Sequence, residues 1–216
     1  DPLWSRGLGD VYKRQCVECV RVPRFAVTGD ASEEGWSKCQ SVSLSVVQTG
    51  EVPKQATTVR VGWDEDRLRL LFEMVDSHPW ATLVERDAPL YTEEVAEVFL
   101  DPEGDAAGYF EIEVNPNNAV LDGVMRRIRS GYRKDFRWQC EGLETAAKLV
   151  EGGWTVELAI PFLSVGNRVP IVGDEWRMNL TRIDRPTGEP RELSAWSPTG
   201  LAQFHVPQRF GRLVFV

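Results

Sequence analysis

The sequence has few of the residues that build metal sites. It contains two histidines and four cysteines in 216 residues. Only Cys16 and Cys19 have the spacing of a zinc-ligand pair, and no second pair of this kind follows them. Since a structural zinc site needs about four ligands, the pattern disfavours zinc. It favours buried free thiols, or one or two disulfides in an oxidising compartment, and leaves their pairing open.

Positive charge and long apolar runs are also scarce. The sequence has 25 lysines and arginines against 33 aspartates and glutamates, which gives a formal net charge of -8. An acidic domain lacks the basic surface that binds nucleic acid or anionic membranes, so we expect neither partner. No apolar run approaches the roughly 20 residues that cross a bilayer, so we expect no membrane insertion. These features leave the oligomeric state open.

The first residues lack any periodic pattern. SRGLGDVYKRQ, at residues 5–15, has neither a helical nor a strand period, nor the apolar segment of a signal peptide. Back-translated, it resembles one reading frame of the transposase adaptor used in shotgun sequencing. We therefore expect residues 1–15 to be a disordered artefact and residues 16–216 to form a single domain. Any export signal would have been replaced by the adaptor.

Short runs of alternating apolar and polar residues dominate the rest of the chain. Clear examples are TTVRVGW (57–63), RLRLLFEMV (67–75) and YFEIEVN (109–115). Gly152 and Gly153 form a two-residue hairpin signal between two further runs. The pattern predicts an all-β fold, an antiparallel and jelly-roll-like β-sandwich of about 9–11 strands with few short helical turns.

The tryptophans divide into core and loop candidates. Trp36, Trp63, Trp154 and Trp176 lie at alternating or helical positions, which is typical of core residues. Trp80 follows a proline in a long loop, where it serves either as a binding platform or as a plug over the end of the sandwich.

Three segments combine aromatic and charged residues at high density. They are predicted loops at 76–94, 129–142 and 196–210. Long loops in a compact domain are more often functional than idle, so we expect the functional residues there.

Several motifs together carry a family resemblance. They are VFLDPEGDAAGYFEIEVNPNN, GGWTVELAIPF, GDEWRMNLTRIDR, WSPT and FHVPQRFGRLVFV, in this order along the chain. This series resembles a family 9 carbohydrate-binding module. The resemblance implies a β-sandwich that binds plant-type polysaccharides or the ends of their oligosaccharides without catalysis. It also implies a secreted or periplasmic protein, associated with glycoside hydrolases and sometimes containing structural calcium.

A sugar site needs aromatic platforms for the ring faces and charged groups for the hydroxyls. The resemblance implies two stacking platforms, and the second falls on Phe204, next to His205. We assign the first to Trp80, with Tyr91 as a further stacking residue. The predicted hydroxyl-binding residues, taken from the clustering of charge, are Glu85, Arg86, Asp87, Glu93 and Arg182.

An acidic turn offers a possible calcium site. Asp101, Glu103 and Asp105 lie close together, and calcium prefers oxygen ligands. The alternative is a solvated acidic turn without a metal.

Two other functions remain as alternatives. A glycoside hydrolase needs two carboxylates facing one cleft, for which the Glu93–Glu94 and Glu111–Glu113 pairs are candidates. A haem-binding electron-transfer sandwich needs two axial ligands. The candidates for those ligands are Met74, Met125, Met178, His78 and His205. Methionines within strands are more often core residues, which disfavours haem.

Overall fold

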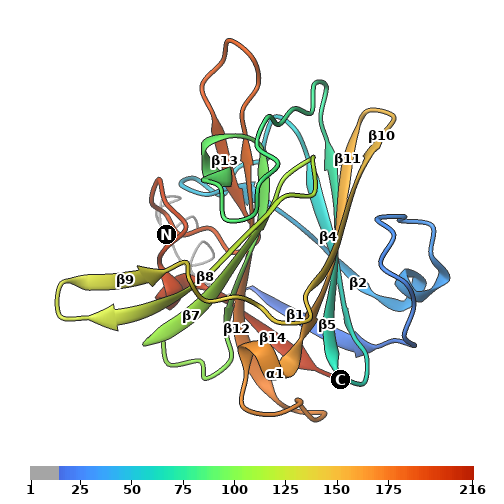
Figure 1. Ribbon diagram of the computed structural model, residues 1–216, viewed down its shortest axis with the longest axis vertical. Coiled ribbons are helices and arrows are strands. Elements are labelled where there is room, and N and C mark those ends of the chain that lie inside the picture. Colours follow the sequence, from blue (N-terminus) through green and yellow to red (C-terminus); the bar gives the residue numbers. More distant parts are fainter. Residues whose placement is uncertain (1–14) are drawn as a thin grey trace, which may run out of the picture.

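Two curved β-layers pack face to face in the computed structural model, which describes residues 15–216 (Figure 1). The predicted adaptor segment therefore lies outside the described residues, apart from Gln15. The predicted all-β sandwich is confirmed, because helical structure is limited to short turns.

Residues 15–216 form 14 strands connected by loops and four short helical turns. The strands are β1 (Cys16–Arg21), β2 (Gln40–Ser43), β3 (Ser45–Val46), β4 (Thr57–Trp63), β5 (Arg67–Val75), β6 (Val95–Asp101), β7 (Gly108–Val114), β8 (Val120–Ile128), β9 (Gly131–Asp135), β10 (Glu144–Val150), β11 (Gly153–Pro161), β12 (Glu175–Asp184), β13 (Glu192–Ala195) and β14 (Gly211–Phe215). The helical turns are η2 (Glu34–Lys38), η3 (Leu90–Thr92), α1 (Phe162–Val165) and η4 (Pro207–Arg209).

Strand β1 joins the two layers. One layer has the order β10-β11-β5-β4, with β2 also paired to β4, and the other has β14-β12-β6-β7-β8-β9. The first half of β1 runs parallel to β14, with Cys16 opposite Arg212. Its second half runs parallel to β4, with Val20 opposite Gly62. A single strand therefore passes from one layer to the other. Its two pairings are parallel, whereas the other strand pairs of the described residues are antiparallel as predicted.

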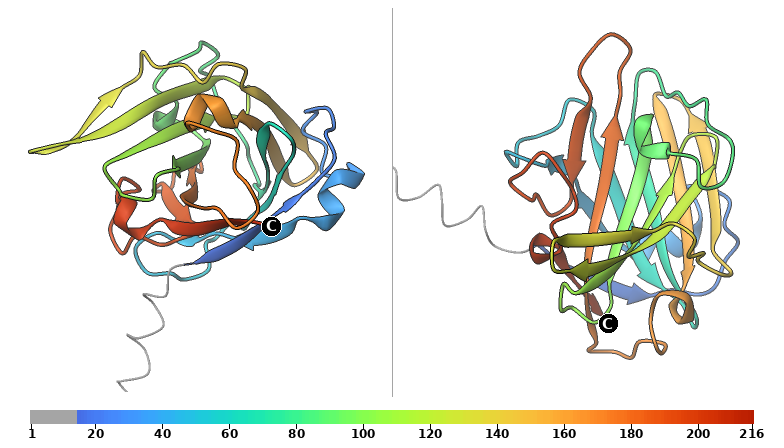
Figure 2. Two further views of the ribbon diagram at one scale, coloured as in Figure 1. Left: turned by 90° about the horizontal axis from the view of Figure 1, so that it is seen from below. Right: turned by 60° about the vertical axis from the view of Figure 1, so that its left-hand side comes forward.

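The described residues contain 14 strands, so the predicted number was too low. Strand β9 accounts for part of the difference, because it lies in the segment 129–142 that was predicted to be a loop. The side chains of β9 are exposed or only half-buried, so no apolar alternation marks it in the sequence. Its pairing with β8 makes it a strand, and Figure 2 shows this hairpin extending beyond the layers.

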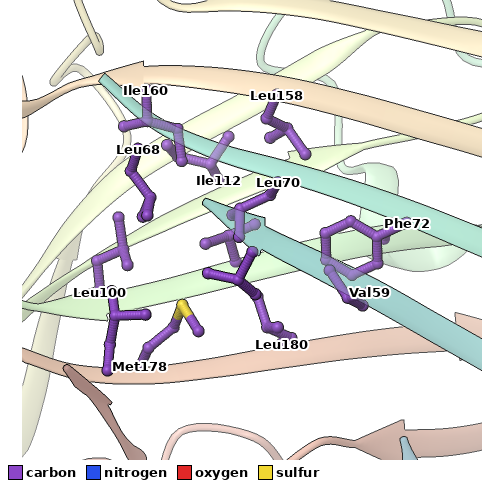
Figure 3. Packing of buried hydrophobic residues seen from close by; sticks show 14 of the residues in the cluster. Val59, Leu68, Leu70, Phe72, Leu100, Ile112, Leu158, Ile160, Met178 and Leu180 are labelled. Atoms are coloured by element: carbon purple, nitrogen blue, oxygen red, sulfur yellow. The ribbon is translucent and has the colours of Figure 1, made fainter. Parts of the chain in front are cut away.

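Large apolar side chains fill the space between the layers. Leu70, Phe72 and Leu158 from one layer face Leu100 and Met178 from the other (Figure 3). The four tryptophans predicted to be core residues are all buried. Met74 and Met125 are buried as well, as expected of methionines that fill a core.

All four cysteines are free thiols in this structure. Burial raises the pKa of Cys39 to about 11 and that of Cys140 to about 12. Because the thiolate is the reactive form, both side chains are expected to be chemically inert at neutral pH.

The β10–β11 hairpin is predicted to be intolerant of a single methyl group. Gly153 lies opposite Val75 of β5, and a Cβ at this position would lie 1.9 Å from the Met74 carbonyl oxygen. Gly153→Ala should therefore lower the free energy of unfolding by about 3 kcal/mol or more, measured by urea unfolding. Gly108→Ala is the matched control, because its Cβ would find its nearest neighbour at 3.4 Å. Equal stability of the two variants would contradict this account of the hairpin.

Candidate functional site

One cavity collects several of the predicted binding residues. It has a volume of about 280 Å³ and lies where β6, β7 and β9 meet the segment around residue 204. Its lining residues are Tyr91, Glu97, Glu111, Glu113, Lys134, Phe136, Ile183, Arg191, Leu193, Ala202, Gln203, Phe204 and His205. Larger hollows exist elsewhere on the described surface, but this one combines predicted aromatic residues with several charged groups.

Two aromatic side chains of the cavity differ in how firmly they are held. Phe204 is buried and belongs to a small apolar cluster, in which its ring centroid lies 6.2 Å from that of Phe99. Tyr91 lies on η3 and is 44% exposed, so part of its ring is free to contact a ligand. The Phe204 ring is therefore fixed by the core, and the Tyr91 ring is accessible from solvent.

Three glutamates form the acidic wall of the cavity. Glu111 and Glu113 are two positions apart on β7 and so share one face of the sheet. Glu97 on β6 lies directly opposite Glu113 in the antiparallel register. Carboxylate oxygens of all three lie within 4.8 Å of one another, and each residue is no more than 2% exposed. Strand register alone thus brings three acidic groups together in a buried position.

The acidic wall resists full ionisation. Burial and, to a smaller extent, the neighbouring charge of Glu111 together raise the pKa of Glu97 to about 8. Burial raises the pKa of Glu111 to about 7 and raises that of Glu113 well above its usual range. The positive charge of Lys134 acts in the opposite direction on all three. Without a further cation, the wall is therefore expected to hold protons at neutral pH.

His205 is neutral and fixed by two hydrogen bonds. Its Nε2 lies 2.7 Å from the Lys134 Nζ, and its Nδ1 lies 2.9 Å from the Tyr109 hydroxyl. Because an ammonium group can only donate, Nε2 accepts and Nδ1 carries the proton that is donated to Tyr109. Burial and the Lys134 charge lower the His205 pKa to about 4. His205 therefore holds Lys134 beside the acidic wall.

The chain matches a known protein family over most of its length. A family model described as carbohydrate family 9 binding domain-like matches residues 27–216. The chain belongs to this family. The resemblance expected from the sequence motifs is thereby confirmed for nearly all of the described residues.

Relatives of this family 9 domain include a protein that it matches over most of its length and much longer enzymes. An extracellular protein of Arthroderma benhamiae is 28% identical over 181 residues, covering 76% of this chain and 80% of the relative. Endo-1,4-beta-xylanase A of Thermotoga maritima is 28% identical over 196 residues. That match covers 84% of this chain but only 16% of the xylanase.

A solved structure shares the fold. A family 9 carbohydrate-binding module of Caldicellulosiruptor kristjanssonii, solved with cellotriose, is 18% identical, with a TM-score of 0.70. The similarity covers 93% of each chain. The same kind of module solved with glucose gives a TM-score of 0.67 at 18% identity, covering 94% of this chain and 96% of that one.

Trp80 and Glu93, both predicted as binding residues, stabilise the loop that precedes β6. The Trp80 indole donates a hydrogen bond of 2.7 Å to the carbonyl oxygen of Arg185. Glu93 accepts hydrogen bonds from the backbone N–H groups of Thr82 and Leu83. Neither Trp80 nor Glu93 is among the lining residues of the cavity. Their contacts hold the loop that presents Tyr91.

Glu85, Arg86 and Asp87 form a turn in the same loop, outside the cavity. Asp87 adopts a positive φ of 60°. Arg86 pairs with Asp122 at 2.6 Å, and Asp87 accepts a hydrogen bond from Gln139 at 3.0 Å. These contacts connect the loop to the chain after β9 and keep the predicted polar residues away from the acidic wall.

Arg182 is completely buried and points away from the cavity lining. Its guanidinium pairs with three carboxylates, Asp76 at 2.7 Å, Asp184 at 3.4 Å and Glu94 at 3.6 Å. A side chain that is 0% exposed is not accessible to a sugar hydroxyl, so Arg182 acts here as an internal counter-ion.

The predicted calcium ligands close the turn after β6. Both side-chain oxygens of Asp101 accept hydrogen bonds from backbone N–H groups of this turn, and Asp105 accepts another. Glu103 accepts a hydrogen bond from the Asn167 side chain. Within residues 15–216, the groups of three or more acidic residues whose oxygens converge lie elsewhere. The residues at this turn fit a capped loop, and calcium there stays a prediction.

Glu97, Lys134 and Arg191 line the cavity but were not predicted as site residues. Glu111 and Glu113 were predicted only as candidate catalytic groups. The available signal was the EIE pattern inside an otherwise apolar strand at 111–113. This alternation is equally typical of a strand with one exposed face, so only the structure shows that Glu111 and Glu113 are buried.

Proposed function

We propose that this family 9 domain binds a carbohydrate without catalysis, in the cavity between Tyr91 and Phe204. The observation that carries the proposal is the pairing of aromatic side chains with charged groups in one small cavity. Sugar rings have apolar C–H faces surrounded by hydroxyls, so both kinds of contact are needed. The Tyr91 ring meets a sugar face, while the glutamates, Lys134 and Arg191 meet its hydroxyls.

Glucose units and short β-glucan oligosaccharides are the first ligands to test. The C. kristjanssonii modules were solved with cellotriose and with glucose, and they share this fold. Plant-type polysaccharides are therefore the ligand class that we infer, with binding at a chain end because the cavity is small.

An accessory role outside the cytoplasm fits this function. The match to xylanase A spans a small part of that enzyme, as expected of an appended binding module. The A. benhamiae relative is described as extracellular, and we infer secretion or periplasmic location for this chain too. Within residues 15–216, no helix is both long and apolar enough to cross a membrane.

The two alternative functions have less support. Glu93 is engaged by the Thr82–Leu83 backbone and Glu94 by Arg182, so the first predicted carboxylate pair does not face the cavity. The three methionines considered as haem ligands are buried among core residues. The Glu111–Glu113 pair does reach the cavity, and an assay for released reducing sugar tests hydrolysis directly.

Tyr91→Ala should weaken cellotriose binding at least about fivefold in isothermal titration, because a stacking contact contributes about 1 kcal/mol or more. The fold should survive, since the Tyr91 side chain is substantially exposed. Val84→Ala is the matched control, because Val84 is an apolar residue of the same loop that is 66% exposed and lies outside the cavity lining. Full affinity in Tyr91→Ala would move the site away from this cavity.

A further inference from the structure

The cavity is one positive charge short of neutrality when its glutamates are ionised. Glu97, Glu111 and Glu113 face the positively charged Lys134 and Arg191 across the same cavity. His205 adds no charge, because its pKa is lowered to about 4 and it is neutral at physiological pH. The site therefore has room for one more cation.

Two buried carboxylate oxygens of the acidic wall also lack a hydrogen-bond partner. Among the described residues, Oε2 of Glu111 and Oε2 of Glu113 are both buried and make no hydrogen bond. Both residues line the cavity, at 2% and 1% exposure. Burying a carboxylate oxygen without a partner is costly, and charged groups cost the most. A ligand that supplies donors at this point would remove that cost.

A primary ammonium group matches the arrangement of the wall. It carries three N–H donors and one positive charge, and it has no acceptor. Three glutamates whose oxygens lie within 4.8 Å of one another offer one acceptor to each donor. A neutral hydroxyl supplies one donor and no charge, so it leaves the wall uncompensated. The neighbouring aromatic residues, Tyr91 and Phe204, complete a site for a ring that carries the amino group.

We propose that the cavity prefers an amino sugar, whose ammonium group is bound by Glu97, Glu111 and Glu113 while its ring contacts Tyr91. This inference rests on the proposed carbohydrate-binding function and narrows its ligand class. Binding exchanges one cation for another: the ammonium group enters with its proton, and a proton held by the acidic wall passes to the buffer. Burial and mutual repulsion raise the pKa values of these carboxyls, so a proton is present to be released near neutral pH.

The test is isothermal titration near pH 7 with glucosamine, glucose and N-acetylglucosamine, each with a chelator present. Glucosamine should bind at least about tenfold more tightly than glucose, a difference of roughly 1.4 kcal/mol. N-acetylglucosamine should lose this advantage, because acetylation removes the charge. Titration in two buffers of different ionisation enthalpy should detect proton release with glucosamine and none with glucose.

Two variants locate the effect. Glu113→Gln should bring the affinities for glucosamine and glucose close together. Glu97→Gln should do the same, and it replaces Glu113→Gln in the test if that variant fails to fold. Glu141→Gln is the matched control, an exposed glutamate outside the cavity lining, and it should keep the preference. Preserved glucosamine preference in both cavity variants would overturn the inference.

The outcomes separate this inference from the proposed function. If glucose and cellotriose bind and glucosamine shows no advantage, the amino-sugar preference is wrong while carbohydrate binding stands. If no sugar binds, the proposed function itself fails. If neutral sugars bind only after calcium is added in place of the chelator, the acidic wall holds a divalent cation and the amino-sugar inference is overturned.

Discussion

Replacing Arg182 with methionine is expected to lower the free energy of unfolding by about 3–5 kcal/mol. Arg182 is the counter-ion shared by Asp76, Glu94 and Asp184, and all four residues are buried. Methionine preserves much of the side-chain volume but removes the charge. The carboxyl groups of Asp76, Glu94 and Asp184 would then remain in a low-dielectric interior without a cation, and breaking a buried ion pair on one side has a large cost.

Arg182 also joins elements that are distant in sequence. Its guanidinium donates a hydrogen bond of 2.8 Å to the Val75 carbonyl oxygen at the end of β5. Its own strand, β12, belongs to the other layer. Because one side chain connects both layers and the start of the 76–94 loop, its loss should destabilise the whole domain and not one turn.

Urea unfolding of the full chain measures this effect. Arg137→Met is the matched control, since Arg137 pairs with Asp135 but its side chain is 91% exposed. An exposed ion pair contributes little, so the control should stay within about 0.5 kcal/mol of the parent. A loss below about 1 kcal/mol in Arg182→Met would show that the carboxylates accept protons or water at little cost.

The domain is also expected to lose on the order of 5 kcal/mol of stability as pH rises from about 6.5 to 8.5. Burial raises the folded-state pKa of Glu97 to about 8 and of Glu111 to about 7, above the usual glutamate value. Burial and a hydrogen bond with Asp76 raise the pKa of Glu94 to about 9. In this interval the folded state holds more protons than the unfolded state, so the free energy of unfolding falls as pH rises.

Other titrating groups define the window for this measurement. The folded-state pKa of His205 is lowered to about 4, so its contribution to stability grows as pH rises toward about 6.5 and is complete there. The raised pKa values of Cys39 and Cys140 reduce stability only at higher pH, where unfolded thiols ionise. Between these limits, the buried glutamates should dominate the slope.

Chemical unfolding at several pH values across this window tests the prediction. A Glu97→Gln, Glu111→Gln double variant should have a flatter pH dependence than the parent, because amides do not titrate. Glu141→Gln should leave the slope unchanged, since that residue is exposed. Stability that stays constant or rises toward pH 8.5 in the parent would show that these carboxyls are ionised throughout.

The strands with strong alternation were predictable from the sequence. Residues 57–63 and 67–75 form β4 and β5 with the predicted bounds. The hairpin predicted at Gly152–Gly153 does connect β10 and β11, but its turn lies one position earlier, at 151–152, because Gly153 already pairs with Val150. Side-chain alternation is a local property of an extended chain with one buried face, so it is visible without knowledge of strand partners. Strand β9 escaped prediction because neither of its faces is buried.

The residues of the candidate site were less predictable than the strands, because most of them come together only in the tertiary structure. The sequence alone singled out Tyr91, Phe204 and His205, which the fold brings to one cavity although more than 100 positions separate the first from the others. The sequence also led us to predict Arg182 as a binding residue, although the structure shows it to be buried. Nothing in the sequence distinguishes a buried charged residue of a strand from an exposed one. Composition and periodicity by themselves determined the all-β class and much of the core. Only strand register and the packing of the two layers decided that Glu97 meets Glu113 and that Arg182 meets three acids, because these contacts depend on partners distant in the chain.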